Sequence, residues 1–146
     1  MSQKSFVPVL RELARTYQAF ESYSAAHIRT LGLTPSQFDI VATLGNTEGM
    51  SFKELGERTL ITKGTLTGVV DRLEAKDLVR RAASPSDGRS QIVQLTRKGV
   101  ALFGKSFPAH LNHVEQAFTT FSQNDLSDIE AALHRLRQAL VAASSK

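Results

Sequence analysis

The sequence lacks cysteine altogether, across 146 residues. Disulfides, zinc–thiolate sites and thiol redox sensing are therefore excluded. It also lacks any apolar run near the roughly 20 residues that a membrane-spanning helix requires. The amino-terminal segment, MSQKSFVPVLRE, has no long apolar stretch of the signal-peptide kind. These absences predict a cytoplasmic protein without a membrane partner. The length of the chain suits one domain with a sizeable core.

Catalytic signatures are missing as well. The chain has no G-x-S-x-G nucleophile motif, no phosphate-binding loop and no carboxylate pair in an evidently apolar setting. His110 and His113 stand three residues apart on an expected helix and could share one metal ion. No cysteine or well-placed carboxylate nearby completes a ligand set for them. The sequence therefore predicts no enzyme, no cofactor and no metal site.

Positive charge is present, and it is concentrated. The whole chain has a formal net charge of +4. Residues 51–98 contain ten Lys/Arg and six Asp/Glu, so this segment alone nets +4, while the rest of the chain holds eight of each sign. A surface that binds nucleic-acid phosphates requires such a concentration. An ordinary solvated charged face is the alternative.

The same segment has the pattern of two helices joined by a tight turn. Ser51 and Glu54 have the capping-box spacing, which predicts a short helix over residues 52–58. Thr62 can cap a second helix. Apolar residues along that helix recur at i, i+3, i+4 and i+7, which predicts one buried face. They are Leu66, Val69, Val70 and Leu73. Such a pair is a helix-turn-helix, whose second helix reads DNA.

A basic hairpin is predicted directly after the second helix. Residues 78–83 and 90–95 have the pattern of short strands, and the turn-rich sequence SPSDGR separates them. A helix-turn-helix followed by a hairpin is a winged helix. Arg89 would lie at or near the tip of the wing, where the negative potential of a narrow minor groove attracts arginine.

With these elements in place, the sequence resembles the MarR family of bacterial transcription regulators. The segment DGRSQIVQLT, Asp87 to Thr96, resembles that family's wing signature and stands in register with VDRLE upstream. One residue departs from the pattern, because Asp77 stands where the family usually has glycine after the recognition helix. That position is expected to need a left-handed backbone, which Asp tolerates better than most residues.

The amino-terminal segment is expected to be a long helix. Seam residues recur at alternating spacings of four and three over residues 6–31, as in a helix that packs along one face. They are Phe6, Leu10, Leu13, Tyr17, Phe20, Ser24, His27 and Leu31. Gly32 ends this helix, and Thr34 with Pro35 begins the next one, which supports the helix-turn-helix from behind.

Two further helices are expected after the wing. The first begins at Thr96 and carries an apolar stripe as far as Phe121, with Pro108 expected to kink it. Ser122 and Asp125 cap the second. Its apolar residues are Leu126, Ile129, Leu133, Leu136 and Leu140.

The expected fold class is mainly α with a small β-wing (α+β), as one MarR-type domain over residues 1–146. Residues 34–98 form the winged helix-turn-helix. The terminal helices, residues 1–31 and 100–146, form a dimerisation lobe, because both carry apolar seams that the winged helix does not use and two-fold dimers are the commonest oligomers. The resemblance implies the same arrangement, since in that family the terminal helices interlock.

Candidate DNA contacts lie on the second helix and the wing. Threonines cost helix propensity, so several on one short helix favour hydroxyl contacts to base edges or phosphates over an ordinary solvated face. Asp87 would orient Arg89 or a nearby arginine, and one of the two strand arginines, Arg80 or Arg81, would face outward. The predicted contacts are Thr62, Lys63, Thr65, Thr67, Arg72, Arg81, Asp87 and Arg89.

The resemblance implies a homodimeric, sequence-specific regulator of transcription that binds an inverted repeat in double-stranded DNA. It is expected to be a repressor released by a small aromatic or phenolic ligand. By resemblance only, the ligand would bind among Tyr17, Tyr23, His27 and Phe38 with part of the segment 103–111, although a core or interface role for His27 is the alternative. An architectural DNA-binding protein without ligand response, or a winged helix used for protein–protein contacts, are the other functions considered.

Overall fold

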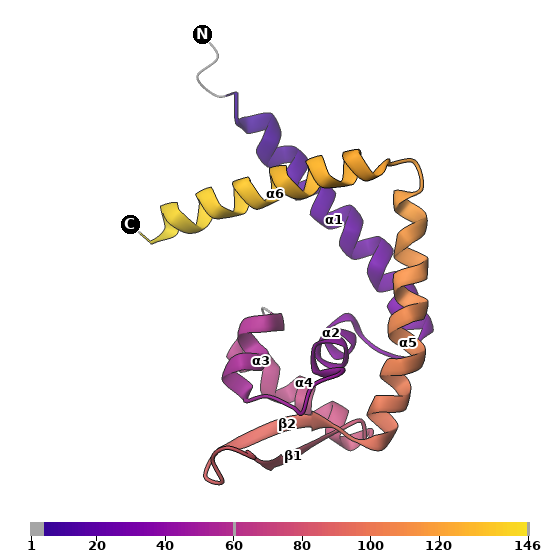
Figure 1. Ribbon diagram of the computed structural model, residues 1–146, viewed down its shortest axis with the longest axis vertical. Helices are drawn as coiled ribbons and strands as arrows, with labels where there is room; N and C mark the ends of the chain where they lie inside the picture. The colour runs from indigo at the N-terminus through magenta and orange to yellow at the C-terminus, as the bar shows by residue number, and fades with distance from the viewer. Residues whose placement is uncertain (1–4, 60, 146) are drawn as a thin grey trace. The chain divides into compact units, whose positions relative to one another are not determined.

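The computed structural model describes residues 5–59 and 61–145 (Figure 1). The elements in order are α1 (Val7–Thr30), α2 (Pro35–Leu44), α3 (Phe52–Thr59), α4 (Lys63–Ala75), β1 (Val79–Ala83), β2 (Gln91–Leu95), α5 (Arg97–Glu115), the 3₁₀ helix η1 (Gln116–Phe118) and α6 (Gln123–Ser144). The predicted fold class, mainly helical with a two-stranded wing, is confirmed. Two compact units divide the chain, Met1–Asn112 and His113–Lys146. None of the described helices is long and apolar enough to span a bilayer.

The first unit is organised around one apolar core. Its fully buried large side chains come from α2, α3, α4 and both strands. They are Ile40, Val41, Leu44, Leu55, Leu66, Val70, Leu73, Val79 and Val93. The predicted inner face of α4 is confirmed, because all four apolar residues assigned to it are buried. The hydrophobic effect on these faces is what fixes α4 against the hairpin.

The hairpin is antiparallel, and its register runs from Val79 opposite Leu95 to Ala83 opposite Gln91. A short bridge ties it to the helices: Met50 and Val93 exchange both backbone hydrogen bonds, at 3.0 and 2.8 Å. In Figure 1 the two strands continue past α3 and α4 to a projecting turn. The wing is thus anchored at its root, and its tip stands away from the core.

The turn between α4 and β1 explains the unusual Asp77. The residue has a φ of 62°, so the predicted left-handed backbone is confirmed. The Leu78 N–H donates to the Leu73 carbonyl at 3.0 Å and the Asp77 N–H to the Glu74 carbonyl at 2.9 Å. This pair of bonds is the Schellman motif, in which glycine is the usual left-handed residue. Asp77 fills that position at a cost in backbone strain that glycine avoids.

Several helix ends also follow their predicted signals. Gly32, with a φ of 81°, follows α1. Thr34 begins α2 through a reciprocal capping box with Gln37, and Ser122 begins α6 through the same arrangement with Asp125. Each box satisfies backbone N–H groups that have no partner within the helix.

Two helix ends differ from the prediction. The stripe that was expected to keep one helix running to Phe121 is interrupted, because α5 ends at Glu115 and η1 follows. Thr62 stands at the start of α4, but its hydroxyl makes no capping bond to the backbone and instead donates to the Thr65 hydroxyl at 3.1 Å. The hydroxyl of Thr62 is thus used by another side chain, which apolar periodicity does not report.

Gly99 and Gly104, both in α5, should respond in opposite ways to alanine. A β-carbon at Gly99 would overlap the Leu78 carbonyl oxygen, which also accepts the Thr96 N–H at 3.0 Å, whereas one at Gly104 meets nothing within 4 Å. We expect Gly99→Ala to lower the free energy of unfolding by about 1–3 kcal/mol, as overpacking does. Gly104→Ala should raise it by roughly 0.5–1 kcal/mol through helix propensity. Urea unfolding of both variants checks this, and equal effects would contradict the close packing at Gly99.

Candidate nucleic-acid interface

The outer face of α4 carries five of the predicted contact residues. All of them are exposed, while the apolar residues of the same helix are buried. They are Thr62, Lys63, Thr65, Thr67 and Arg72. Because no side chain caps the start of α4, its first backbone N–H groups are available to an anion, and the helix dipole favours negative charge there. The face therefore presents short hydroxyls, two cations and a helix amino terminus.

The wing tip is shaped by Asp87. Its Oδ1 accepts the Arg89 backbone N–H and its Oδ2 accepts the Ser90 hydroxyl, both at 3.0 Å. Ser84 closes the loop by donating its N–H to the Ser90 carbonyl at 2.8 Å. Asp87 thus organises the loop backbone around Arg89. The Arg89 guanidinium is exposed and has no hydrogen bond or ion pair among the residues that the structure describes.

Arg81, another predicted DNA contact, has protein partners. It forms ion pairs with Glu74 and, at 2.7 Å, with Asp71. Its guanidinium also lies 5.4 Å from the centre of the Phe52 ring. The hydrogen bond to Asp71 and the nearby negative charges hold the pKa of Arg81 above its ordinary value. The two ion pairs hold β1 against α4, and the contact with the Phe52 ring holds it against α3. Of the two strand arginines, Arg80 is the exposed one.

A cleft of about 750 Å³ lies between α3, α4 and the hairpin. Lys63 and Thr67 contribute to its wall from α4, together with Lys53 from α3 and Gln91 from β2. Lys53 and Gln91 were not among the residues chosen from the sequence. Gln91 is the exposed first residue of β2, so strand alternation could have found it, whereas only packing places Lys53 beside α4.

A second cluster brings together two of the four residues assigned to ligand binding. His27 and Phe38 both contact His110: the two imidazoles stack with centroids 5.2 Å apart, and the Phe38 ring meets His110 edge-on at 4.8 Å. The Nδ1 atoms of the histidines are 3.0 Å apart, and Ser24 Oγ lies 3.1 Å from Nε2 of His110. Phe38, Ser24 and His110 are buried.

The two tyrosines assigned with them lie on α1 as well. Tyr23 is half-buried, next to Ser24 in sequence. Tyr17 is 58% exposed, and it precedes His27 by ten positions, about 15 Å along the helix. The structure therefore groups His27 and Phe38 with His110, which the sequence had singled out only as a possible metal ligand. Across the described ranges, no group of three or more His, Cys, Asp or Glu is arranged to hold a metal ion.

A recognition helix with an exposed polar face, followed by a basic wing, defines a winged-helix DNA-binding regulator of transcription. The comparisons agree: the model of the MarR family matches residues 31–90. The transcriptional regulator MhqR of Bacillus subtilis is 30% identical over 136 residues, which cover 93% of each chain. The chain belongs to the MarR family.

Two further relatives carry information on function. The homoprotocatechuate degradative operon repressor of Escherichia coli is 27% identical over 135 residues, covering 92% of this chain and 88% of that one. A structure of Bordetella bronchiseptica BpsR concerns the regulation of its DNA binding by 6-hydroxynicotinic acid. It has a TM-score of 0.76 and 26% identity, covering 94% of this chain and 95% of that one.

The role of Asp87 in the wing can be tested without DNA. Asp87→Ala removes the acceptor of the Arg89 N–H, so amide hydrogen exchange at Arg89 should become faster, whereas Asp87→Asn keeps a carbonyl acceptor and should change it less. The residue is exposed, so the free energy of unfolding should fall by no more than about 1 kcal/mol. Exchange measured by NMR on both variants decides the matter. An unchanged Arg89 amide in Asp87→Ala would mean that the carboxylate does not hold the loop.

Proposed function

We propose that the protein is a homodimeric transcriptional repressor that binds an inverted repeat in double-stranded DNA and acts in the cytoplasm. In this proposal α4 enters the major groove, the wing lies on the flanking minor groove, and a small aromatic acid or phenol releases the complex. The proposal rests on one observation: α4 and the wing tip expose a set of basic and hydroxyl-bearing side chains on the side away from the apolar core.

The chemistry of α4 suits the major groove. Thr62 and Lys63 stand at its amino terminus, the end that a recognition helix commonly brings to the bases. Thr65 and Thr67 are short enough to reach base edges or phosphates. Arg72, two turns further along, suits the phosphate backbone, where such contacts fix the register of the protein.

Arg89 suits the minor groove because its guanidinium has no hydrogen bond or ion pair to give up among the described residues. Arginine inserted there responds to the width and potential of the groove, so it favours A·T-rich sequence without reading single bases. In this scheme Asp87 acts through the loop backbone. Arg81 would contribute to binding mainly by holding the wing root against α4, since two carboxylates already neutralise it.

Dimerisation is supported by apolar side chains that one chain leaves exposed. On α1 and just before it these are Phe6, Val9, Leu10, Leu13, Tyr17 and Phe20, and on α6 they are Ile129, Leu133, Leu140 and Val141. Monomeric proteins rarely expose apolar side chains in such continuous rows. A two-fold dimer would cover both rows. Its two recognition helices would then lie one turn of DNA apart, about 34–36 Å, which predicts the inverted repeat.

Ligand release is supported by the cluster of His27, Phe38 and His110. It offers ring faces and imidazole nitrogens, which suit an aromatic compound with an acidic hydroxyl or carboxylate. Tyr23 lies close to it in sequence, and Tyr17 would take part only in a longer site along α1. The relatives point to the same class of compound: one is the repressor of an operon for an aromatic acid, and the DNA binding of the other is regulated by 6-hydroxynicotinic acid.

The DNA-binding geometry predicts a specific effect of Arg89→Ala. If each subunit neutralises on the order of three to four phosphates, log K should fall against log salt with a slope of roughly −5 to −7. Arg89→Ala should weaken every duplex, reduce the preference for A·T pairs under the wing and make that slope shallower by about two per dimer. Arg29→Ala, which removes the same charge from the exposed end of α1, is the matched control.

Fluorescence anisotropy with duplexes selected from a random pool provides the measurement. If Arg89→Ala keeps full affinity for DNA, the wing does not enter the minor groove. A slope near zero for the wild type would favour a winged helix that binds proteins. Binding without sequence preference or ligand response would favour an architectural role.

The dimer proposal is tested by molar mass. Light scattering should give twice the chain mass of 16.0 kDa at micromolar concentration. Leu133→Glu places a charge on the exposed apolar row of α6 and should shift the mass toward the monomer, because an unpaired buried charge is costly. Gln138→Glu adds the same charge on another side of α6 and should leave the mass unchanged. A wild-type monomer would refute the proposal.

A further inference from the structure

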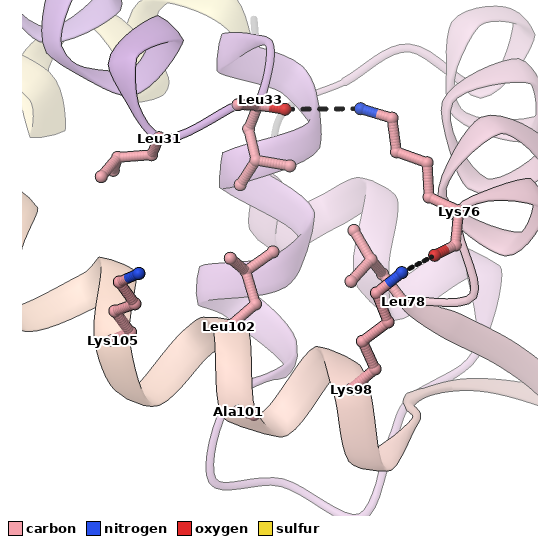
Figure 2. Close-up of a pocket in the computed structure, with 9 residues that line it drawn as sticks. Leu31, Leu33, Lys76, Leu78, Lys98, Ala101, Leu102 and Lys105 are labelled. Carbon is pink, nitrogen blue, oxygen red and sulfur yellow. Dashed lines mark hydrogen bonds between the residues drawn. The ribbon is translucent and has the colours of Figure 1, made fainter.

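A second cavity, of about 550 Å³, lies on a different part of the first unit (Figure 2). Three segments form it: the corner between α1 and α2, the turn after α4, and the first half of α5. The lining residues are Leu31, Gly32, Leu33, Lys76, Leu78, Lys98, Ala101, Leu102 and Lys105. Its volume lies in the range of small-molecule sites, roughly 300–1,000 Å³.

The floor of this cavity is aliphatic. Leu33 and Leu78 are buried at 5% and 4% exposure, Leu31 and Leu102 are half-buried, and no aromatic side chain lines the space. Figure 2 shows Leu33, Leu78 and Leu102 between the three lysines. Such a floor favours a flexible hydrocarbon chain, since it offers no ring for stacking.

The rim is basic without an acidic residue. Three of the nine lining residues are lysines, and none is Asp or Glu. Lys76 donates its ammonium N–H groups to the Gly32 carbonyl at 3.4 Å and to Gln37 Oε1 at 3.1 Å. Lys98 donates to the Lys76 carbonyl at 3.1 Å. Two of the cations are therefore held in place by neutral oxygens (Figure 2), with N–H donors left over.

No acidic side chain that the structure describes neutralises the positive charge at this rim. None of Lys76, Lys98 and Lys105 takes part in an ion pair within residues 5–59 and 61–145. Elsewhere in the same unit Arg58 and Arg81 do have carboxylate partners. Three cations around one cavity, without a carboxylate partner, attract an anion.

The cavity is separate from both surfaces described above. Lys98, Ala101, Leu102 and Lys105 recur at i, i+3, i+4 and i+7 on α5, which is one helix face, whereas Ser106 and His110 are buried on another. The cavity lies at the carboxyl end of α4. Thirteen residues of helix, about 20 Å, separate that end from Thr62.

We infer that this cavity is a binding site for an aliphatic carboxylate, with the carboxylate at the lysine rim and the hydrocarbon chain on the leucine floor. Both halves of the ligand are needed. The anion is recognised by charge-assisted hydrogen bonds, and each methylene placed on the floor strengthens binding, by up to about four-fold when it is fully buried. The inference does not depend on DNA binding or on ligand release.

Octanoate below its micelle concentration is the probe, titrated into the isotope-labelled full chain without DNA and followed by NMR. We expect saturable binding at one site per chain, with shifts at residues 31–33, 76–78 and 98–105. Acetate, which has the charge without the chain, and 1-octanol, which has the chain without the charge, should each bind at least ten-fold more weakly.

Charge variants complete the test. Lys105→Gln should weaken the binding of octanoate by about three-fold or more. The double variant with Lys98→Gln and Lys105→Gln should weaken it by at least ten-fold. Arg97→Gln removes a neighbouring charge on α5 that does not line the cavity and should change the affinity by less than two-fold. All three positions are exposed, so the variants should fold, and melting temperatures check that they do. The inference is overturned by non-saturable binding, by equal affinity for 1-octanol, by an unaffected double variant, or by shifts centred on His27 and Phe38.

Discussion

One residue, Leu78, connects through its backbone the parts on which DNA recognition depends. Its N–H completes the turn that ends α4, and its carbonyl accepts the Thr96 N–H at the foot of the wing. The same carbonyl packs on Gly99 at the start of α5, where no β-carbon fits. The direction of the recognition helix, the root of the wing and the start of α5 are therefore set at one point. A displacement there would move all three together, because a close-packed contact has no slack to absorb it.

Electrostatic pairing within the chain separates its arginines into two groups. Arg81 has two carboxylates and an aromatic ring, so its charge is used to hold a strand against two helices. Arg89 and Arg72 are exposed, and their charge remains available to a partner. A count of basic residues in the segment 51–98 cannot make this distinction, since it depends on which acidic side chains the fold brings near each arginine.

Local signals in the sequence predicted most of the fold. The capping residues Ser51, Thr34 and Ser122 marked helix starts, apolar spacing identified the buried face of α4, and the family pattern drew attention to Asp77. These features act within a few residues of one another. What the sequence did not reveal depends on distant partners: the pairing of Arg81 with α4, and the contact of His27 with a histidine 83 residues away. The residues chosen on α4 and Arg89 on the wing are exposed, as the pattern suggested, whereas Arg81 is paired within the chain. The lysine-rimmed cavity required three separate segments to meet.

The short distance between the two imidazoles in the first unit restricts where their protons lie. With Nδ1 of His27 and Nδ1 of His110 in hydrogen-bond contact, neutral rings must be complementary tautomers, one bearing its proton on Nδ1 and the other not. If His110 is the donor, its Nε2 accepts the Ser24 hydroxyl; if His27 is the donor, Nε2 of His110 donates to Ser24. The whole chain of bonds reverses as one. Reversal exchanges the donor and acceptor roles of both nitrogens in each ring, so neither histidine can change its tautomer alone.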